Sequence, residues 1–593
     1  MGEWCGFGRF CGCGRLITPA GMWLSAGMIQ HDILIIGAGL SGMRAAFEGI
    51  TAGLNTAVVS KIHPLRSHSC AAQGGVNAAI NPKDDWHNHA YDTIKGADYV
   101  GDQDSIEVMC REAPQAVLDL DAMGCPFSRE EDGTIAQRPF GGQNFPRTAY
   151  AADRTGHAML HTLWEQAIKL GTQIYDEYFL LKITTDNGRA SGAIVMDIKT
   201  GKLLQIQAKA VCVCTGGYGR VFASNTNAMT NTGDGIAHAM RAGAAAADLE
   251  FVQFHPTGLR NSGILISEGV RGEGAYLIGK DGQRFMSKYA PNKLELASRD
   301  VVSRSMTTEI TNGNGVNGAV FLDVRHLGRD LILERLPQIR QLSIDFEGVD
   351  PIDQPIPVRP TCHYTMGGIR TDKLGHSQQV QGLFAAGEAA CVSVHGANRL
   401  GANSLLETIV FGKITGKEMV DYVKTREGKE WPKCDGADLQ AVSAEIAQLK
   451  ARPAAGGVKQ AQIRHDLTDA MQEHCSVFRD AKGLDLAMKA VQKAKADMQK
   501  VYVDDKSDAF NTDVITAMEL GNLVLLAEAT VLAAMERTES RGAQARTDYP
   551  ARDDVNWITH ITSTVGADGN IVLGRDVVRL VDNPLYAPAE RKY

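Results

Sequence analysis

The spacing of apolar residues near the start of the chain predicts a βαβ unit. An apolar stretch centred on residues 33–36 predicts a buried strand, and a glycine-rich turn and an alanine-rich helical segment follow it. The stretch LNTAVVSKI at 54–62 then predicts a second strand. Strand, turn, helix and strand in this order form the unit from which doubly wound nucleotide-binding domains are built.

Two later segments repeat the pattern of an apolar strand followed by glycines. They are AVCVCTGGYGRVF at 210–222 and the stretch 382–412, which begins with GLFAAGEAA. Because ligands of such folds bind at the carboxyl ends of the strands, we expect both segments to join the first strand in one sheet. The nucleotide-binding domain is therefore predicted to be discontinuous.

The residues between these segments, from about 250 to 360, predict a second domain that faces the cofactor. Within them GAVFLDV at 318–324 predicts a strand and ELASRDVVSRSMTTEI at 295–310 predicts a helix. Beyond residue 428 the pattern is that of packed amphipathic helices. Apolar residues keep helical spacing at Leu439, Val442, Ile446 and Leu449 and again at Leu484, Met488, Val491 and Met498.

Composition narrows the classes of function. A chain of 593 residues exceeds one hydrophobic core, and its net charge of −8 lacks the basic excess typical of nucleic-acid binding. We expect no nucleic-acid partner. The 12 cysteines are scattered, which favours a reducing compartment. No run of 18 or more apolar residues occurs, so we expect no direct membrane span.

Residues 1–27 match no clean targeting signal, because they lack a twin arginine and an uninterrupted apolar core. We expect an unstructured extension or a misplaced start, with a diverged mitochondrial presequence as the alternative.

The glycine spacing Gly37-x-Gly39-x-x-Gly42 falls in the predicted turn between strand and helix. There glycine permits the tight bend, lets the backbone approach a pyrophosphate and allows the helix to pack closely on the strand. This context predicts dinucleotide binding. The second strand ends in Ser60 and Lys61 instead of the acidic residue that usually holds a ribose, so the type of nucleotide cannot be predicted from this position.

Many separate motifs make the chain similar to the flavoprotein subunits of succinate dehydrogenase and fumarate reductase, the succinate:quinone oxidoreductase family. They include RSHSCAAQGG, GCPFSREEDGTIAQRPFGGQ, QFHPTG, SEGVRGEG, ASRDVVSRS, CHYTMGGI, HGANRLGANSLLE and ESRGAQARTDYPARDD. They occur in the same order as in the family and span 28–593.

The resemblance implies FAD as the dinucleotide, attached covalently through His68. A neutral imidazole nitrogen is a competent nucleophile toward the 8α position of an oxidised flavin, which supports this assignment. The resemblance also implies FAD contacts at Gly37, Ala38, Gly39, Leu40, Ser41, Gly42, Ser60, Lys61, Ser67, Ser69, Gly74, Gly75, Asp234, Glu388, Ser404 and Leu405.

The substrate implied by the family is a four-carbon dicarboxylate, succinate or fumarate, whose two carboxylates need cations or strong donors at both ends. The matching substrate-binding positions are Phe140, His255, Ser267, Glu268, His363 and Arg399. The family's proton-transferring arginine corresponds to Arg299, with Glu268 and Arg271 as its relay to solvent. From chemistry alone a histidine would be expected, because a guanidinium is a poor base.

Electrons must leave the flavin through another subunit, because the chain has no clustered cysteines for an iron–sulfur centre and we expect no metal site in it. The family implies an iron–sulfur subunit and membrane anchor subunits that bind quinone. The chain would then be a peripheral membrane protein on the cytoplasmic side of a bacterial inner membrane, or on the matrix side in mitochondria.

The expected fold is α/β: a Rossmann-like FAD-binding domain with an inserted α+β capping domain, a C-terminal helical bundle and a small C-terminal domain. The expected boundaries are a disordered extension at 1–27, the FAD-binding domain at 28–250 and 361–428, the capping domain at 251–360, the helical domain at 429–540 and the C-terminal domain at 541–593.

The expected activity is the oxidation of succinate to fumarate. Three alternatives stay open at this point. A quinol:fumarate reductase would run the same site backwards. An L-aspartate oxidase would lack the flavin-linking histidine. A flavin-carrying protein without substrate chemistry would lack the set Arg299, His363 and Arg399, which is present.

Overall fold

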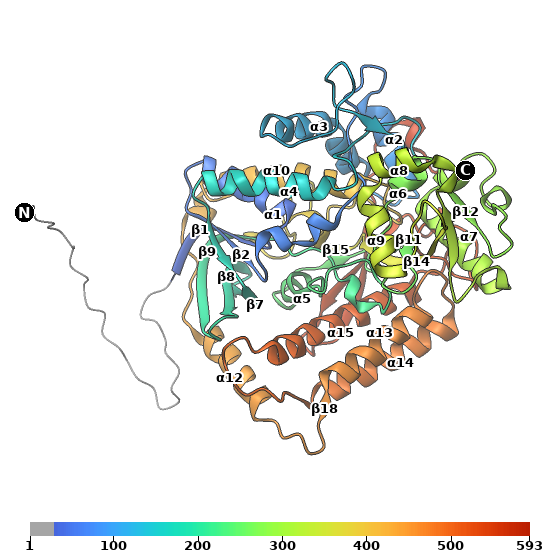
Figure 1. The fold of residues 1–593 in the computed structure, drawn as a ribbon. Coiled ribbons are helices and arrows are strands. Elements are labelled where there is room, and N and C mark those ends of the chain that lie inside the picture. Colours follow the sequence, from blue (N-terminus) through green and yellow to red (C-terminus); the bar gives the residue numbers. More distant parts are fainter. Residues whose placement is uncertain (1–28, 593) are drawn as a thin grey trace, which may run out of the picture.

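A computed structural model describes residues 29–592, so the extension predicted at 1–27 lies outside the described residues. A seven-stranded sheet forms the centre of the nucleotide-binding part (Figure 1). Its middle strand β1 pairs in parallel with β2 on one side and β9 on the other. The strands are β1 (Ile29–Ile36), β2 (Thr56–Ser60), β6 (Gln173–Asp176), β7 (Tyr178–Asp186), β8 (Arg189–Asp197), β9 (Leu203–Val213) and β16 (Leu383–Ala385).

The segments predicted to share one sheet do so. Strand β16 pairs in parallel with β9, which itself pairs with β1, although the two strands β9 and β16 are separated by the whole inserted segment. Side chains at 33–36 are buried on both faces of the sheet, which explains the continuous apolar run in β1. The carboxyl ends of β1, β9 and β16 therefore lie at one edge.

Helices cover this sheet and bring distant segments together. Helix α1 (Leu40–Thr51) packs against α10 (Asn403–Tyr422), and a Cβ at Gly412 would lie 2.8 Å from the carbonyl oxygen of Ser41. The remaining helices of this part are α2 (Trp86–Gly96), α3 (Gln103–Ala122), α4 (Thr155–Lys169), α5 (Asp234–Arg241) and α11 (Arg426–Lys429). A small sheet of β3 (Val76–Asn77), β5 (Thr148–Ala149) and β4 (Gln137–Arg138) contacts α10 through β3.

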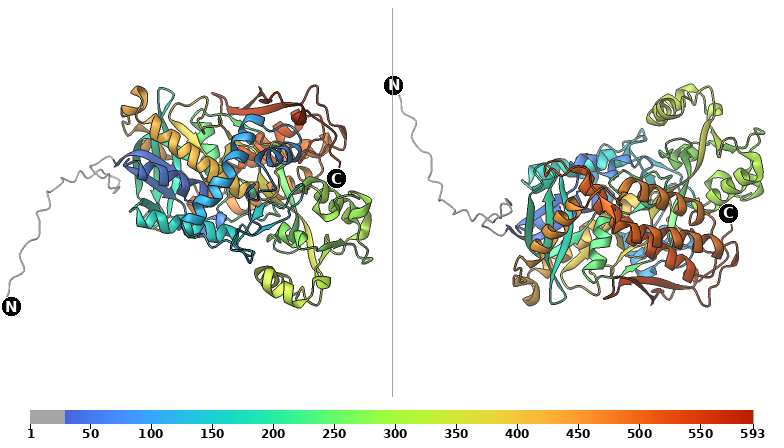
Figure 2. Two further views of the ribbon diagram at one scale, coloured as in Figure 1. Left: turned by 90° about the horizontal axis from the view of Figure 1, so that it is seen from above. Right: turned by 90° about the horizontal axis from the view of Figure 1, so that it is seen from below.

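The inserted segment has a sheet and an apolar core of its own. Antiparallel strands occur in the order β11 (Val252–Leu259), β14 (Ile356–Thr365), β13 (Val320–Asp323) and β12 (Tyr276–Ile278). Helices α6 (Glu268–Gly272), α7 (Arg299–Glu309), α8 (Arg329–Arg335) and α9 (Pro337–Glu347) accompany them. The predicted strand at 318–324 and helix at 295–310 are present as β13 and α7. Figure 2 shows this segment, in light green and yellow, projecting from the rest of the molecule.

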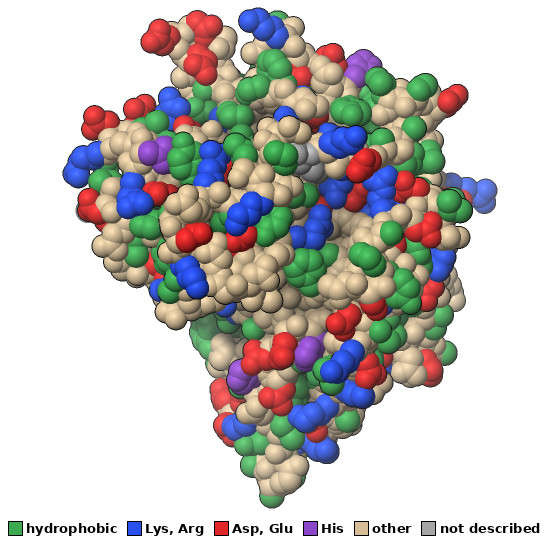
Figure 3. Space-filling view, turned by 90° about the vertical axis from the view of Figure 1, so that its right-hand side faces the viewer, with side chains coloured by type: hydrophobic (Ala, Val, Ile, Leu, Met, Phe, Trp, Pro, Cys, Tyr) green, Lys and Arg blue, Asp and Glu red, His purple; other side chains and the backbone are tan. Residues whose placement is uncertain are grey.

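The second core, which includes Phe285, Val302, Leu322 and Val358, is separate from the large core of the nucleotide-binding part. Its buried residues run from Leu259 to Val358, whereas Val252 and Phe254 belong to the large core, and the boundaries at 251–360 stay a prediction. On the face that carries this segment, acidic and basic side chains are interspersed (Figure 3).

The helical region follows the predicted spacing. Val442, Ile446 and Leu449 are buried in α12 (Ala437–Ala451), and Leu484 and Val491 are buried in α14 (Ala481–Met498). They are joined by α13 (Gln460–His474) and α15 (Thr512–Glu536), with the short strands β18 (Val458–Lys459) and β19 (Val501–Tyr502).

Helix α15 is long and apolar enough to cross a membrane by length and composition alone, and 72% of its most apolar window is buried inside the fold. It therefore packs as a core helix, with Leu520, Leu523 and Leu526 fully buried.

The C-terminal segment adds a hairpin to a second sheet of the nucleotide-binding part. Strands β20 (Thr559–Val565) and β21 (Ile571–Val577) continue the order β17 (Ala390–Cys391), β15 (Gly368–Arg370) and β10 (Ala246–Ala247). Buried His560 on β20 bonds to Asp248 at 2.8 Å and to Asp102 at 3.1 Å. The hairpin is thus fixed to the nucleotide-binding part by a buried polar cluster.

Candidate active site

A cavity of about 580 Å³ lies where the nucleotide-binding part meets the inserted segment, and the carboxyl ends of β1 and β9 form part of its wall. The glycine fingerprint shapes this wall. Gly37 has φ +112°, and a Cβ there would lie 2.2 Å from the carbonyl oxygen of Cys214 on the neighbouring strand. A Cβ at Gly42 would lie 1.9 Å from the carbonyl oxygen of Gly37, so only glycine at position 42 lets helix α1 pack this closely against the turn. Any larger side chain would disrupt this turn.

Two helices begin at this cavity. Gly39 at the start of α1 and Ala402 at the start of α10 provide no side-chain cap, and residues from the first turn of both helices line the wall. Of the N–H groups in α1, that of Leu40 donates to Ser69 Oγ at 3.2 Å. Unpaired N–H groups and the positive end of the helix dipole favour an anion such as a pyrophosphate.

At another part of the cavity wall, Lys61 lies between two carboxylates. Its Nζ is 2.6 Å from Asp234 and 2.7 Å from Glu519 of α15. Burial opposes the charge on Lys61, but the two carboxylates outweigh it and raise the pKa of its ammonium group. Asp234 from α5 therefore brings to this wall a carboxylate that the end of β2 lacks.

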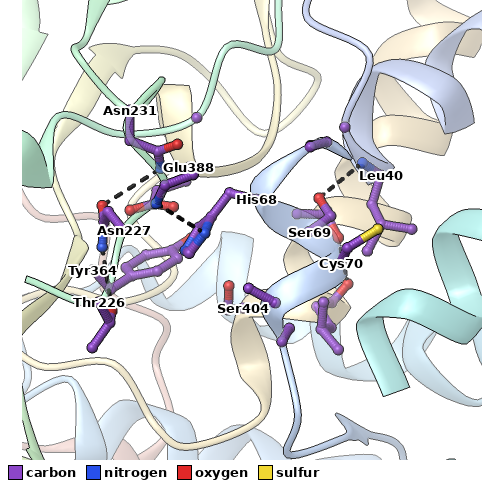
Figure 4. A pocket seen from close by; sticks show the side chains of 18 of the residues that line it. Leu40, His68, Ser69, Cys70, Thr226, Asn227, Asn231, Tyr364, Glu388 and Ser404 are labelled. Carbon is purple, nitrogen blue, oxygen red and sulfur yellow. Dashed lines mark hydrogen bonds between the residues drawn. The ribbon is translucent and has the colours of Figure 1, made fainter. Parts of the chain in front are cut away.

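His68 lies in a short 3₁₀ segment, His68–Ala71, and its ring lines the cavity. Its Nδ1 accepts a hydrogen bond from the Ala228 N–H at 3.3 Å, and burial lowers the pKa of the imidazole to about 4. In Figure 4 the His68 ring points toward Tyr364 and Glu388, whereas Ser69 and Cys70 lie on the side of Leu40. His68 is therefore neutral at physiological pH, and Nε2 remains for another partner.

Two further histidines face each other across the substrate side of the cavity. The rings of His255 on β11 and His363 on β14 have centroids 5.0 Å apart. His255 Nδ1 accepts from the Thr257 N–H at 3.2 Å, so its neutral ring carries the proton on Nε2. Burial and neighbouring arginines lower the pKa of both rings well below the ordinary value. Both histidines are therefore neutral and able to donate.

Arg399 is a buried guanidinium with no carboxylate partner. Its side chain is 2% exposed and stacks 4.3 Å from the Tyr364 ring, and its Nε finds no hydrogen-bond acceptor among the described residues. Burial, and next Arg299, lower its pKa to about 9. Because an unpaired buried cation is costly, this arrangement indicates a position for an anion.

Arg299 is held by two acceptors. Its Nε donates to Glu268 at 2.6 Å and its Nη1 donates to Gln253 at 3.0 Å. The other oxygen of Glu268 accepts from the Gly141 N–H at 2.7 Å. Burial acts against ionisation of Glu268, but Arg299 and Arg271 outweigh it and lower the pKa of the carboxyl. Nη2 of Arg299 is the guanidinium nitrogen that neither bond uses.

Most of the predicted site residues meet in this one cavity. The predicted residues on its wall are Gly37, Ala38, Gly39, Leu40, Ser41, Ser60, Lys61, Ser67, His68, Ser69, Gly74, Gly75, Phe140, Asp234, His255, Ser267, Glu268, Arg299, His363, Glu388, Arg399, Ser404 and Leu405. Gly42 and Arg271 do not line it. Arg271 lies behind Glu268 at 3.8 Å and is fully buried, so the ion-pair path Arg299–Glu268–Arg271 leads into the protein.

Three neighbours of these residues were not predicted. Thr226 Oγ1 bonds to His363 Nδ1 at 2.8 Å, Tyr364 supports Arg399, and Gln253 orients Arg299. Tyr364 follows His363 directly in CHYTMGGI, so strict alternation along a strand would have turned it away from the site. Gln253 stands two residues before His255 in QFHPTG, so alternation would have placed it on the same face as His255.

Shifts in strand register explain this difference. Gln253 pairs with Tyr364 and Phe254 pairs with Cys362, so His363 is an extra residue on β14. A second shift separates His255 from Gly258 on β11. Such bulges turn side chains toward active sites, and here they allow His363 and Tyr364 to line the same cavity.

The residues on this wall fit FAD. The uncapped start of α1 can receive the pyrophosphate, Asp234 and Ser60 offer polar groups for the adenosine, and His68 faces the cavity with a free Nε2. Glu388, whose pKa is raised to about 7 by burial, accepts from the Thr365 N–H at 3.1 Å. Within the described residues, no group of three or more His, Cys, Asp or Glu side chains could hold a metal ion.

Family models match nearly the whole chain. A model described as an FAD binding domain matches residues 32–405, and one described as the C-terminal part of the fumarate reductase flavoprotein matches residues 464–593.

Curated relatives are similar over their full length. The succinate dehydrogenase flavoprotein subunit of Rickettsia bellii is 45% identical, with 96% of this chain and 100% of the relative covered. The mitochondrial succinate dehydrogenase [ubiquinone] flavoprotein subunit of Oryza sativa is 48% identical, with 92% and 90% covered. The fumarate reductase flavoprotein subunit of Mycobacterium tuberculosis is 40% identical, with 95% and 99% covered.

Solved structures agree in fold. The FrdA chain of E. coli quinol fumarate reductase, in a mutated form, superposes with a TM-score of 0.91 at 38% identity, covering 95% of this chain and 99% of that one. Mycobacterium smegmatis Sdh1 superposes with a TM-score of 0.83 at 34% identity, covering 94% and 96%. With these matches and a cavity built from the same motifs, the chain belongs to the FAD-binding flavoprotein subunits of the succinate dehydrogenase and fumarate reductase family.

Proposed function

We propose that this chain is the flavoprotein subunit of a succinate dehydrogenase and oxidises succinate to fumarate on a bound FAD. The observation that carries the proposal is Arg399, a buried cation without a carboxylate partner, beside two neutral histidines in the cavity that also contains His68. A dicarboxylate supplies the missing negative charge. The FAD, when bound, supplies the acceptor for the hydride of this reaction.

The two ends of the substrate have different partners. Arg399 offers a planar set of donors to one carboxylate, and this geometry suits bidentate binding. His255 and His363 can donate from their neutral rings. Ser267 uses its hydroxyl oxygen to accept from the Gly269 N–H at 3.1 Å, which leaves the hydroxyl proton for the ligand. Phe140, 3% exposed, packs beside this position and excludes water.

Arg299 takes the proton in this proposal. Its two bonds to Glu268 and Gln253 fix the guanidinium plane, and Nη2 remains to face the substrate carbon. To accept the proton, Arg299 would start as a neutral guanidine with its lone pair on Nη2. The arriving proton would complete the guanidinium, and the Nε proton could then pass to Glu268, 2.6 Å away. The ionised state of Glu268 favours this transfer, and Arg271 stabilises the same carboxylate from behind.

We also propose that His68 holds the FAD covalently through Nε2 at the 8α carbon. The bond from the Ala228 N–H occupies Nδ1 and is compatible with a substituent on Nε2. Because Nδ1 accepts from the Ala228 N–H, the neutral ring carries its one proton on Nε2, and this proton would have to leave for Nε2 to hold the flavin.

Electron transfer away from the flavin needs partner subunits. The relatives are named as subunits, and the Sdh1 structure is described as a complex with UQ1. We propose an iron–sulfur subunit that docks on this chain and membrane anchor subunits that bind quinone. The chain would then be a peripheral membrane protein on the cytoplasmic side in bacteria, or on the matrix side in mitochondria.

The reverse direction is the second candidate, favoured by the high structural similarity to quinol fumarate reductase. The same residues serve both directions, because a catalyst accelerates forward and reverse reactions alike. The potentials of the partner centres then decide which direction operates.

The test uses the purified flavin-containing chain under anaerobic conditions. Succinate should bleach the visible absorbance of the oxidised flavin, and fumarate should restore it. L-aspartate should leave the absorbance unchanged. Bleaching by L-aspartate but not by succinate would refute the proposal in favour of an amino-acid oxidase.

A further inference from the structure

A second cavity, of about 660 Å³, is lined by residues of α5, α12, α15 and β7. The residues that line it differ from those that line the active-site cavity. Helix α5 contributes residues to both cavities. Asp234 at its start lines the active-site cavity, and His238 and Arg241 line the second cavity. The proposed dehydrogenase mechanism uses none of the residues that line the second cavity.

The floor of this second cavity is apolar and elongated. Helix α12 contributes Val442, Ile446 and Leu449 along about two of its turns, and α15 contributes Ala517 and Met518. Such a floor can take an aliphatic chain of several carbons, and the flexible methionine can adapt to it. An apolar floor of this kind is typical of sites for ligands with a hydrophobic body.

One wall of the cavity carries a cation without an ion-pair partner. Arg241 Nη1 donates to Asn522 Oδ1 at 2.5 Å and Nη2 donates to the carbonyl oxygen of Gly521 at 3.3 Å. Both acceptors are neutral, and no carboxylate of the described residues forms an ion pair with Arg241. Asn522 is itself fixed, because its amide nitrogen donates to Asp234 at 2.8 Å. Arg241 is therefore held with its charge facing the hollow.

His238 stands one helical turn before Arg241 on the same wall. Its side chain is 8% exposed, and its ring forms no hydrogen bond with any residue that the structure describes. Burial, and next Arg241, lower the pKa of this histidine to about 3, so the ring is neutral. A neutral imidazole beside a guanidinium provides a second donor for an anionic group.

The other charged groups around the cavity compensate this cation only in part, through Glu445 of the lining and Asp234 at the start of α5. Lys182 pairs with Asp438 at 2.6 Å, and Arg452 donates to the carbonyl oxygens of Met498 and Val501. Glu445 is the remaining acid of the lining and offsets part of the charge. Three cations against two acids give the cavity an excess of one positive charge, because His238 is neutral.

We propose that this cavity binds an aliphatic monocarboxylate, with the carboxylate on Arg241 and His238 and the alkyl chain along the apolar face of α12. One positive charge matches one carboxylate, and the apolar floor matches the chain. The site lies apart from the dicarboxylate position, so its ligand does not compete with succinate.

Isothermal titration calorimetry with decanoate tests the site on the full chain with its flavin. Decanoate should bind once per chain, and 1-decanol should bind at least about tenfold more weakly because it lacks the charge. Arg241→Glu should weaken decanoate binding at least about tenfold. Ala441→Trp, on the exposed side of α12, should fill the hollow and abolish binding.

The matched control is Arg575→Glu, which reverses an exposed charge outside the cavity that pairs with Glu536 at 2.8 Å. This variant should bind decanoate like the unchanged chain. Circular dichroism and thermal unfolding verify that each variant is folded. No saturable binding, equal binding of 1-decanol, or binding that survives both cavity variants would overturn the proposal.

Discussion

At the scale of single residues, the site depends on charges that are buried before any ligand arrives. Arg399 illustrates the cost, because its guanidinium packs on the ring of Tyr364, its Nε lacks a hydrogen-bond acceptor, and it forms no ion pair with any of the described residues. Removing one member of a well-paired buried ion pair destabilises a protein, whereas removing an unpaired buried charge also removes the desolvation cost of that charge. The free protein and the liganded protein should therefore respond in opposite ways to its replacement.

Replacing Arg399 with Gln tests this point. Without ligand, we expect the variant to unfold at the same or a higher temperature than the unchanged chain, because an unpaired buried charge is lost. With the dicarboxylate malonate at about 100 times its Kd, the unchanged chain should gain about 2.7 kcal/mol of stability. The variant should gain almost none. Thermal unfolding with and without malonate measures both effects.

Arg359→Gln is the control, because this half-buried arginine of β14 lies outside the active-site cavity and its Nε also lacks a partner. Its malonate response should equal that of the unchanged chain. A full malonate response in Arg399→Gln would show that the anion binds elsewhere.

His68 makes the second prediction at this scale. In His68→Ala, flavin should be released into the supernatant when the protein is precipitated with acid, whereas the unchanged chain should retain it. His63→Ala is the matched control, because His63 lies in the same loop region and packs on Trp164. Release from the unchanged chain would contradict a covalent bond.

The pH dependence of flavin attachment follows from the lowered pKa of His68. A histidine with an ordinary pKa of about 6.5 would lose most of its neutral form by pH 5.5. With a pKa of about 4, His68 stays neutral there. Protonation of His68 should therefore not slow flavin attachment as the pH falls from about 8 to about 5.5. A rate that halves near pH 6.5 would contradict the burial of this ring.

At the scale of elements, the sequence predicted the strands but not their irregularities. The apolar run of β1 and the glycine fingerprint are local patterns, formed by residues close together in the chain, so both can be recognised in the sequence. The register shifts between β11 and β14 depend on pairing between strands about a hundred residues apart. For this reason the position of Tyr364 beside the site was not predictable from alternation, whereas Gln253, two residues before His255, could have been found in this way.

The C-terminal hairpin shows the same limit. The sequence predicted a small C-terminal domain at 541–593 but not the pairing of β20 with β10, a two-residue strand far away in sequence. His560 then joins Asp102 and Asp248 in a buried cluster, and Arg370 bonds to Asp102 at 3.0 Å. Burial opposes a charge on His560, but the two carboxylates raise its pKa to about 9.

This cluster predicts a dependence of stability on pH. Because the pKa of His560 is raised in the folded state, its contribution is fully present below about pH 6.5 and is lost as pH rises through about 9. The contribution is on the order of 3 kcal/mol. In His560→Gln, stability should fall at pH 6 by several kcal/mol, since two buried carboxylates lose their cation.

Urea unfolding between pH 6 and pH 10 measures this effect. The difference between the unchanged chain and His560→Gln should shrink as pH rises. His465→Gln, an exposed histidine of α13, serves as the control and should follow the unchanged chain. A constant difference across the pH range would mean that His560 is neutral in the folded protein.

At the scale of the whole molecule, the site exists only where two parts of the fold meet. His68 and Arg399 come from the nucleotide-binding part, whereas His255, Glu268 and Arg299 come from the inserted segment. The discontinuity of the first part was predictable from its three glycine-rich strand ends. The depth of the cavity was not predictable, because it depends on how the sheet of the inserted segment packs over the loops that follow these strand ends.

The burial of α15 has a consequence at this scale too. Its apolar composition matches a membrane helix, but its leucines fill the core beside α13 and α14. Helix α15 therefore stabilises the fold with the apolar residues that would face lipid in a membrane helix.

The central claim is that Arg299 moves the proton while the dicarboxylate is held by Arg399 and the two histidines. The most direct test measures succinate-dependent reduction and fumarate-dependent reoxidation of the flavin in single turnovers, for the unchanged chain and Arg299→Ala. Arg304→Ala is the control, because this arginine lies on the same helix and bonds to Asp300 and the Gly542 carbonyl oxygen. Arg299→Ala should lose at least about 10³-fold in both directions and still bind malonate, whereas Arg304→Ala should keep its activity. An Arg299→Ala variant within about tenfold of the unchanged chain would contradict the account.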